Sequence, residues 1–193
     1  MKNQAKVHVF LVLFLGLALI SNTGNGQTLN LQNKSKIQVD GISNVHDWTV
    51  EATDAKGELQ LVTNDSQVGI EHILFTAPVL KLESGKEGMD KKMFKALETD
   101  QYKTIRFELT DSKNCQGLSS GENGVDLVGK LTIKGKTKAV SIKSKITIEN
   151  GRVHIQGTHK LNMKDYGIDP PTALFGTIST GEEVVVKFNL QFI

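Results

Sequence analysis

The fold class is decided by residues 184–192, which read VVVKFNLQF. Apolar side chains occupy every second position of this stretch, namely Val184, Val186, Phe188, Leu190 and Phe192. Successive side chains of a β-strand point to opposite faces, so a period of two predicts a strand with one apolar face. The intervening Lys187, Asn189 and Gln191 predict that the opposite face is solvated.

The same alternation recurs along the chain and predicts an all-β, antiparallel protein. It is found near residues 37–39, 48–52, 105–109, 125–133, 140–148 and 153–163. Asn150-Gly151 and Lys134-Gly135 predict tight hairpin turns, because Asn and Gly tolerate positive φ. Gly57 is expected to bend or bulge one long strand from Trp48 to Val62. Eight or nine strands at this spacing are typical of a sandwich or a barrel.

Two segments depart from the alternation. Residues 90–97 carry apolar side chains at helical spacing with Met89, and they predict one short helix with Asp90 as its N-cap or in its first turn. Residues 167–176 contain Pro170-Pro171, which cannot continue a central strand, and they are expected to form a loop over one end.

The first 26 residues are expected to be a signal peptide. Lys2 and Lys6 precede an apolar run over residues 9–20, which is too short to span a bilayer as a helix and fits a secretory signal. Small residues at Gly24 and Gly26 suggest cleavage before Gln27. Residues 27–193 then form one domain, and the protein is expected to be exported, as a periplasmic or secreted protein.

Charge and cysteine content exclude several classes of function. Without Lys2 and Lys6, the 23 basic residues of the chain become 21 and equal the 21 acidic ones, so no nucleic-acid partner is expected. Cys115 is the only cysteine, so no intramolecular disulfide forms. It lies in a polar stretch, residues 111–124, without a neighbouring histidine to activate it. No hydrolase or phosphate-binding motif is present, and neither a metal, a cofactor nor enzymatic activity is expected.

Two histidines are the candidates for polar contacts. His46 and Trp48 share a strand face, whereas Asp47 between them points away, so His46 and Asp47 do not converge on one atom. His159 falls on the apolar face of its strand. A structural role is favoured for these histidines, with ligand contact as the second interpretation and metal binding or catalysis as the third.

The interior of the predicted barrel is apolar and uncharged. An eight-stranded barrel can be filled by its own side chains or can hold one small ligand. Four small residues on the inward faces could leave space for a ligand: Ala52, Gly129, Ser144 and Gly157. The residues alone leave a filled and a hollow barrel equally open.

Several segments resemble the YceI-like family. They are GKLTIKGKTKAV at 129–140, LNMKDYGI at 161–168, the region from Met89 to Phe107, and the opening from Val39 to Trp48. The sequence departs from the family pattern at Met89, Lys103 and Met163. The resemblance implies an exported, lipocalin-like, up-and-down β-barrel of about eight strands with one short helix. It also implies a polyisoprenoid, an isoprenoid quinone or a fatty-acyl lipid as ligand.

The predicted ligand site combines this resemblance with the inward faces. The cavity wall is expected to include Trp48, Val50, Phe107, Leu131, Leu161 and Phe188, with Phe94 and Phe175 near the mouth and with His46 and His159 meeting a polar head group. Transient membrane contact and a homodimer are compatible with this role. The alternative is a filled barrel that acts without a ligand, as a stress-related or interaction module of the cell envelope. An enzyme that uses His46 or His159 is the third hypothesis.

Overall fold

The computed structural model describes residues 25–64 and 67–193. These residues form twelve strands, one α-helix and four short 3-10 helices. The strands are β1 Asn25–Asn30, β2 Lys36–Ser43, β3 Trp48–Ala52, β4 Lys56–Asn64, β5 Gln67–Pro78, β6 Leu82–Glu83, β7 Thr104–Asp111, β8 Gly121–Ile133, β9 Lys136–Glu149, β10 Arg152–Asn162, β11 Thr172–Ala173 and β12 Ile178–Phe192. The helix α1 spans Glu87–Ala96, and the 3-10 helices span Val79–Lys81, Lys113–Cys115, Met163–Tyr166 and Leu174–Gly176.

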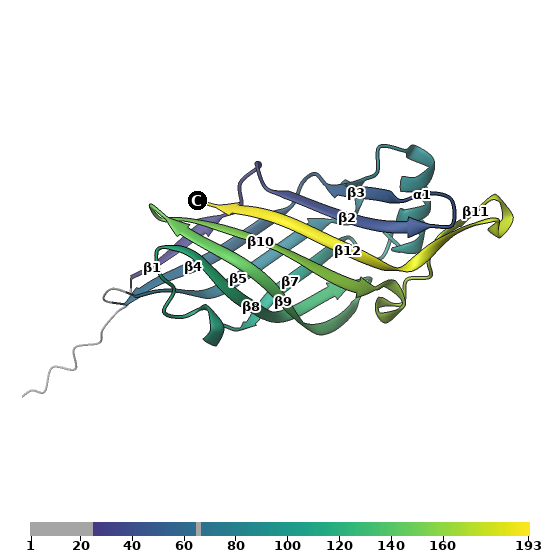
Figure 1. Cartoon of the computed structure of the whole chain (residues 1–193). Helices are drawn as coiled ribbons and strands as arrows, with labels where there is room; N and C mark the ends of the chain where they lie inside the picture. The colour runs from purple at the N-terminus through teal and green to yellow at the C-terminus, as the bar shows by residue number, and fades with distance from the viewer. Residues whose placement is uncertain (1–24, 65–66) are drawn as a thin grey trace, which may run out of the picture.

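The strands follow one another around an antiparallel, up-and-down barrel (Figure 1). The last strand closes it, because β12 pairs with β10 on one side and with β2 on the other. At the end of β1, Leu31 bridges to Phe192, and the Asn30 amide donates to the Ile193 carbonyl oxygen at 2.8 Å. The predicted all-β barrel with one helix is therefore confirmed.

Twelve strands occupy about eight positions around the wall because three long strands are each broken in two. β1 and β2 both contact β12, β4 pairs with β1 while β3 pairs with β2, and β6 continues the course of β5. The two-residue strand β11 adds a short hairpin to β12. The predicted bend at Gly57 is wrong in position, because the chain leaves the strand at residues 53–55 and shifts register between Gln60 and Leu61.

Both predicted hairpin turns are present. Asn150 and Gly151 have φ values of 51° and 72°, and Lys134 and Gly135 have 48° and 70°. Positive φ at both central residues gives the turn a twist that matches the flanking strands. These turns join β9 to β10 and β8 to β9, and they set the register of both ladders.

Helix α1 begins earlier than predicted. Lys86 occupies the N-cap without a side-chain hydrogen bond, and Glu87 starts the helix and forms an exposed ion pair with Lys91 at 2.7 Å. Asp90 lies in the first turn, which is the second of the two predicted places, and it also anchors the preceding loop, because its carboxylate accepts hydrogen bonds from the Ser84 amide at 2.9 Å and from the Ser84 hydroxyl at 2.6 Å. The apolar face of the helix, which includes Met89 and Met93, packs over one end of the barrel.

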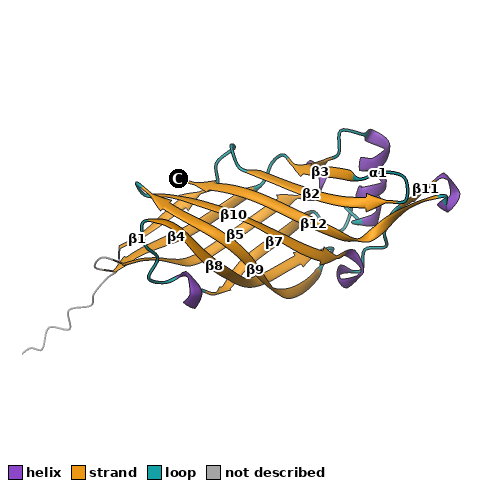
Figure 2. Cartoon of the chain, viewed as in Figure 1, coloured by secondary structure: helices purple, strands orange, loops and turns teal. Residues whose placement is uncertain are grey.

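The opposite end of the barrel is filled by its own side chains. Figures 1 and 2 show α1 and β11 at one end of the molecule and β1 at the other. The filled end has side chains less than 2% exposed, among them Leu29, Leu59, Ile70, Ile146, Ile155 and Phe192. Cys115 and Leu118, from the segment predicted to be a polar loop, are buried in this same cluster.

The structure bears on membrane-spanning helices and on the predicted signal peptide as follows. Among residues 25–64 and 67–193, no helix combines the length and the apolar character that a bilayer span requires. The predicted signal peptide lies outside the described residues, except for Asn25 and Gly26, which begin β1.

Aromatic rings cover three glycines of the wall. A Cβ at Gly41 would lie 2.0 Å from the Trp48 ring, and one at Gly157 would lie 2.4 Å from the Phe188 ring. At Gly129 it would lie 2.4 Å from the backbone oxygen of Glu108 and 2.6 Å from the Phe107 ring. Gly129 and Gly157 therefore do not leave open space, because a phenylalanine ring packs against each of them.

The substitution Gly129→Ala should lower the free energy of unfolding by about 1–3 kcal/mol, because its Cβ would overlap the Glu108 oxygen and displace the Phe107 ring. Gly124→Ala is the matched control in the same strand, since a Cβ there meets nothing within 4 Å. Its effect should stay within about 0.5 kcal/mol. Urea unfolding at constant pH measures both, and equal effects would contradict the ring-over-glycine packing.

Candidate functional site: an apolar cavity inside the barrel

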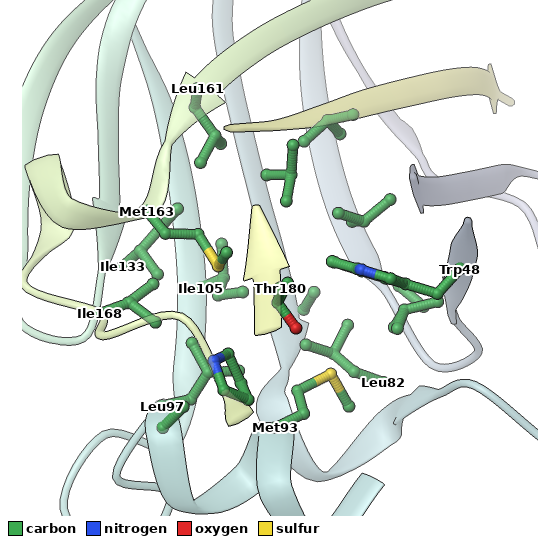
Figure 3. A pocket seen from close by; sticks show the side chains of 18 of the residues that line it. Trp48, Leu82, Met93, Leu97, Ile105, Ile133, Leu161, Met163, Ile168 and Thr180 are labelled. Atoms are coloured by element: carbon green, nitrogen blue, oxygen red, sulfur yellow. The ribbon is translucent and has the colours of Figure 1, made fainter. Parts of the chain in front are cut away.

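The half of the barrel next to α1 is hollow. A cavity of about 530 Å³ lies there, within the size range of small-molecule sites. Its lining is almost wholly aliphatic and aromatic. Figure 3 shows side chains from separate elements converging on it, with these labelled: Trp48, Leu82, Met93, Leu97, Ile105, Ile133, Leu161, Met163, Ile168 and Thr180.

The floor of the cavity is the top of the filled core. Ile73, Phe107 and Leu190 belong to the buried cluster of the filled end and also line the cavity. Phe75 and Phe188 pack against the same cluster and complete the floor. The rings that cover Gly129 and Gly157 thus mark the boundary between the filled and the hollow halves.

The mouth of the cavity is framed by α1 and by the segment before β12. Met89 and Met93 face the cavity from the helix, and Pro171 and Thr172 face it from the segment that contains β11. The Lys92 ammonium donates a hydrogen bond to the Thr172 carbonyl oxygen at 2.9 Å, which ties the two sides of the mouth together. This segment is the predicted end-covering loop, and it lies at the barrel end as expected.

Trp48 is fixed in the wall by one hydrogen bond. Its indole Nε1 donates to the Ile42 carbonyl oxygen at 3.1 Å, while the ring rests on Gly41. The polar edge of the ring is thereby satisfied, and its apolar face is left to the cavity. Because Trp48 is the only tryptophan in the chain, its fluorescence reports on this cavity alone.

Eight of the ten residues predicted for the ligand site line the cavity. They are Trp48, Val50, Phe107, Leu131, Leu161, Phe188, His46 and His159. They come from strands β3, β7, β8, β10 and β12 and from the turn before β3. Their contact with a ligand remains a prediction.

Phe94 and Phe175 do not line the cavity. Phe94 lies on another face of α1, where it borders a shallow depression with Lys95 and Glu98. Helical spacing placed it with Met93, but adjacent helical residues point about 100° apart. Phe175 projects into solvent and is fully exposed, because Leu174 and Phe175 both adopt a left-handed backbone with φ of 47° and 55°.

His46 lies at the rim, in an exposed turn between β2 and β3. Its Nδ1 donates to the Asp47 carbonyl oxygen at 2.8 Å, and the Ser43 hydroxyl donates to the His46 carbonyl oxygen at 2.7 Å. The Asp47 side chain is not part of the lining. The predicted strand face shared by His46 and Trp48 is wrong, because β2 ends at Ser43 and β3 begins at Trp48, so His46 and Asp47 lie outside both strands.

His159 faces the cavity from β10, where its partner across the ladder is Val186. Burial lowers the pKa of its imidazole below the ordinary 6.5. A neutral imidazole has one ring nitrogen that donates a hydrogen bond and one that accepts a hydrogen bond. His159 thus brings a polar, uncharged group into an otherwise apolar wall.

Several lining residues were not predicted from the sequence. Met89, Met93 and Met163 lie in the helix and family motifs that had been singled out, and their apolar character was the available signal. Thr180 and the two lysines at the mouth, Lys86 and Lys92, had no such signal. Polar residues outside an alternating strand look like ordinary surface residues in a sequence.

The remaining candidate nucleophile lies far from the cavity. Cys115 is fully buried in the filled end, and burial raises the pKa of its thiol to about 11. A thiol at that pKa is almost wholly protonated at neutral pH and is a weak nucleophile. Among the described residues, no group of His, Cys, Asp and Glu side chains is arranged to hold a metal ion.

Comparisons with known proteins agree with this architecture. The model of the YceI-like domain matches residues 30–192, and no curated protein has a matching sequence. A polyisoprenoid binding domain from Saccharophagus degradans, implicated in plant cell wall breakdown, has a TM-score of 0.66 at 15% identity and covers 85% of this chain and 97% of its own.

Two further solved structures show the same fold. BcnA of Burkholderia cenocepacia has a TM-score of 0.64 at 16% identity, over 82% of this chain and 96% of its own. The YCEI protein of Campylobacter jejuni has a TM-score of 0.56 at 11% identity, over 74% and 82%. At these identities the similarity establishes the fold.

The lowered pKa of His159 should make stability depend on pH. Above pH 6.5 the imidazole is neutral in both the folded and the unfolded state. As the pH falls below 6.5 the unfolded state takes up the proton first, so stability is lost through the window between 6.5 and the lower folded pKa. His159→Leu should therefore lose less stability than the native chain between about pH 7 and pH 5. Denaturant unfolding measures this, with His46→Leu at the exposed rim as the control, and a loss as large as that of the native chain would contradict it.

Proposed function

Since this chain belongs to the YceI-like domain family, we propose that it is an exported binding protein that holds one apolar, chain-like molecule inside its barrel. The observation that carries the proposal is the 530 Å³ cavity, which is walled by apolar side chains and closed below by the filled core. The candidate ligands are polyisoprenoids, isoprenoid quinones and fatty-acyl lipids. The similarity to a polyisoprenoid binding domain supports this class.

The hydrophobic effect is sufficient to hold such a ligand. Each methylene group removed from water contributes about 0.8 kcal/mol, so ten of them contribute about 8 kcal/mol before the cost of association. Micromolar binding requires about 8 kcal/mol in total. Since association itself costs about 4 kcal/mol or more, a chain that buries about 15 methylene groups reaches this affinity without an ion pair. The function of the protein would be to shield apolar surface from water.

The alternative of a wholly filled barrel fits the structure less well. Side chains fill only the half that contains Leu29, Ile70 and Phe192, while the half next to α1 is open. We also propose that the site binds its ligand and does not catalyse a reaction. His46 and His159, the titratable groups suggested for an enzyme, lie at the rim and in the wall without a carboxylate partner among the residues of the lining.

The proposal extends to ligand exchange at a membrane surface. The exposed side chains of Leu174 and Phe175 project from the segment that frames the mouth. Exposed Val45 lies in the neighbouring turn, where Asn44 binds the Thr177 carbonyl oxygen at 2.8 Å. Apolar side chains beside the entrance of an apolar cavity suit transient insertion between lipid headgroups, through which a chain could pass with little exposure to water.

Filling the cavity should abolish binding without unfolding the protein. Ala52 lines the cavity, and Ala52→Phe places a ring in the space that the ligand would occupy. Ala139→Phe adds the same ring to the solvent-exposed face of β9 and serves as the control. We expect Ala52→Phe to weaken uptake of a fluorescent long-chain probe at least tenfold and to remove lipid that is detected by native mass spectrometry. Equal binding by both variants, or no probe and no lipid on the native chain, would overturn the carrier role.

Removing the exposed ring should slow exchange but leave equilibrium binding unchanged. We expect Phe175→Ser to slow transfer of a fluorescent lipid from phospholipid vesicles, with the same final occupancy. Leu80→Ser, at another exposed apolar position outside the cavity lining, is the control. If Phe175→Ser leaves the transfer rate unchanged and instead dissociates a homodimer in analytical ultracentrifugation, Phe175 forms a dimer contact and the proposed membrane contact is wrong.

A further inference from the structure

The charged side chains that line the cavity are positive. Among its described lining residues, the charged side chains are Lys86 and Lys92, and none is Asp or Glu. Besides Trp48, whose indole N–H donates to the Ile42 carbonyl oxygen, the side chains that can hydrogen-bond are those of Ser43, His46, His159, Thr172 and Thr180. A molecule whose chain fills this cavity therefore meets positive charge and hydrogen-bond donors at the mouth, without a carboxylate of the lining to repel an anion.

The two lysines flank the apolar face of α1. Met89, Lys92, Met93 and Ala96 all line the cavity, at the three- and four-residue spacing that places side chains on one side of a helix, and the N-cap residue Lys86 lines it from the start of α1. Met89, Met93 and Ala96 form the apolar middle of this face. Lys86 and Lys92 lie beside it, so an extended chain that contacts the methionines would have its head group within reach of the ammonium groups.

The acidic residues of the same helix have other partners. Glu87 pairs with Lys91 at 2.7 Å, and the Asp90 carboxylate accepts the two hydrogen bonds from Ser84. Among the described residues, neither Lys86 nor Lys92 forms an ion pair. Lys92 donates one hydrogen bond to the Thr172 carbonyl oxygen at 2.9 Å, which leaves two of its three N–H groups for a ligand.

The size of the cavity limits the length of chain that it can enclose. A cavity of about 530 Å³ lies within the range of sites that take one small molecule. A chain longer than the cavity would extend through the mouth, past Lys92 and Thr172.

We propose that the preferred ligand is a single-chain amphiphile with an anionic head, a carboxylate or a phosphate monoester, that is held at the mouth by Lys86 and Lys92. This inference rests on the proposed carrier function and narrows its ligand class. The chain supplies most of the affinity, and the lysines select the charge of the head.

The test compares ligands of equal chain length on the delipidated native chain. Hexadecanoic acid, hexadecyl phosphate, hexadecan-1-ol and methyl hexadecanoate are titrated below their aggregation concentrations, with Trp48 fluorescence as the readout. Acetate and inorganic phosphate test the head groups alone. We expect both anionic amphiphiles to bind about 3- to 10-fold more tightly than the alcohol and the ester, with a difference that shrinks as salt is raised, and the small anions not to bind.

The double variant Lys86→Gln/Lys92→Gln should remove this preference. In this double variant the acid and the phosphate should bind no more tightly than the alcohol, so that the ratio of their affinities falls to about one. Lys91→Gln/Lys95→Gln is the matched control, because it removes the same charge from α1 at positions outside the lining. Thermal unfolding of each variant verifies that the fold is retained.

The outcomes separate this inference from the carrier function. Equal binding of charged and neutral amphiphiles, or equal losses in the two double variants, would overturn the anionic site and leave the carrier function intact. Binding of free phosphate or acetate at the same affinity would show a simple anion site and would also overturn the proposal. If no long-chain molecule alters Trp48 fluorescence or is retained, the carrier function itself fails.

Discussion

The closure of the sheet through β12 is the interaction on which the rest of the structure depends. Because β12 pairs with both β10 and β2, the wall is held by interstrand hydrogen bonds around its circumference. A wall held in this way does not need a filled interior along its whole length. An empty apolar space of 530 Å³, counted at about 24 cal/mol per Å³, forgoes on the order of 10 kcal/mol of packing. The ladders and the filled end must therefore carry the fold.

The division into a filled and a hollow half follows from where large side chains meet small ones. Phe107 contacts Gly129 and Phe188 contacts Gly157, and both rings line the floor of the cavity. Below this level, Phe192 and a ring of Leu, Ile and Val side chains meet across the barrel. Above it, α1 covers the opening with methionines, whose flexible side chains suit a variable ligand surface. The cavity is consequently a property of the arrangement of rings, helix and β11 segment together.

Most strands were predictable because burial on one face imposes a period of two, and the stretch from Val184 to Phe192 shows it plainly. Positive φ at Asn150-Gly151 and Lys134-Gly135 was equally readable, since few other residues tolerate it. The break at residues 53–55 was not predictable, because no glycine or proline marks it. Phe94 and Phe175 were expected near the mouth. Phe175 lies in the segment that frames the mouth but projects into solvent, and Phe94 packs from another face of α1, because the local backbone sets which way each ring points.

By itself, the sequence determined the alternating faces, the hairpin turns, the short helix and the apolar character of the interior. These depend on local geometry and on which side chains avoid water, and both are properties of neighbouring residues. Whether that interior is filled depends on distances across the barrel, which involve residues such as Trp48, Phe107, Met93 and Leu161 from distant parts of the chain. Only the tertiary structure decided this, and it also placed Lys86 and Lys92 beside the apolar lining. The contacts of a lysine depend on residues that are distant in the sequence, so the sequence alone did not distinguish these two from other surface lysines.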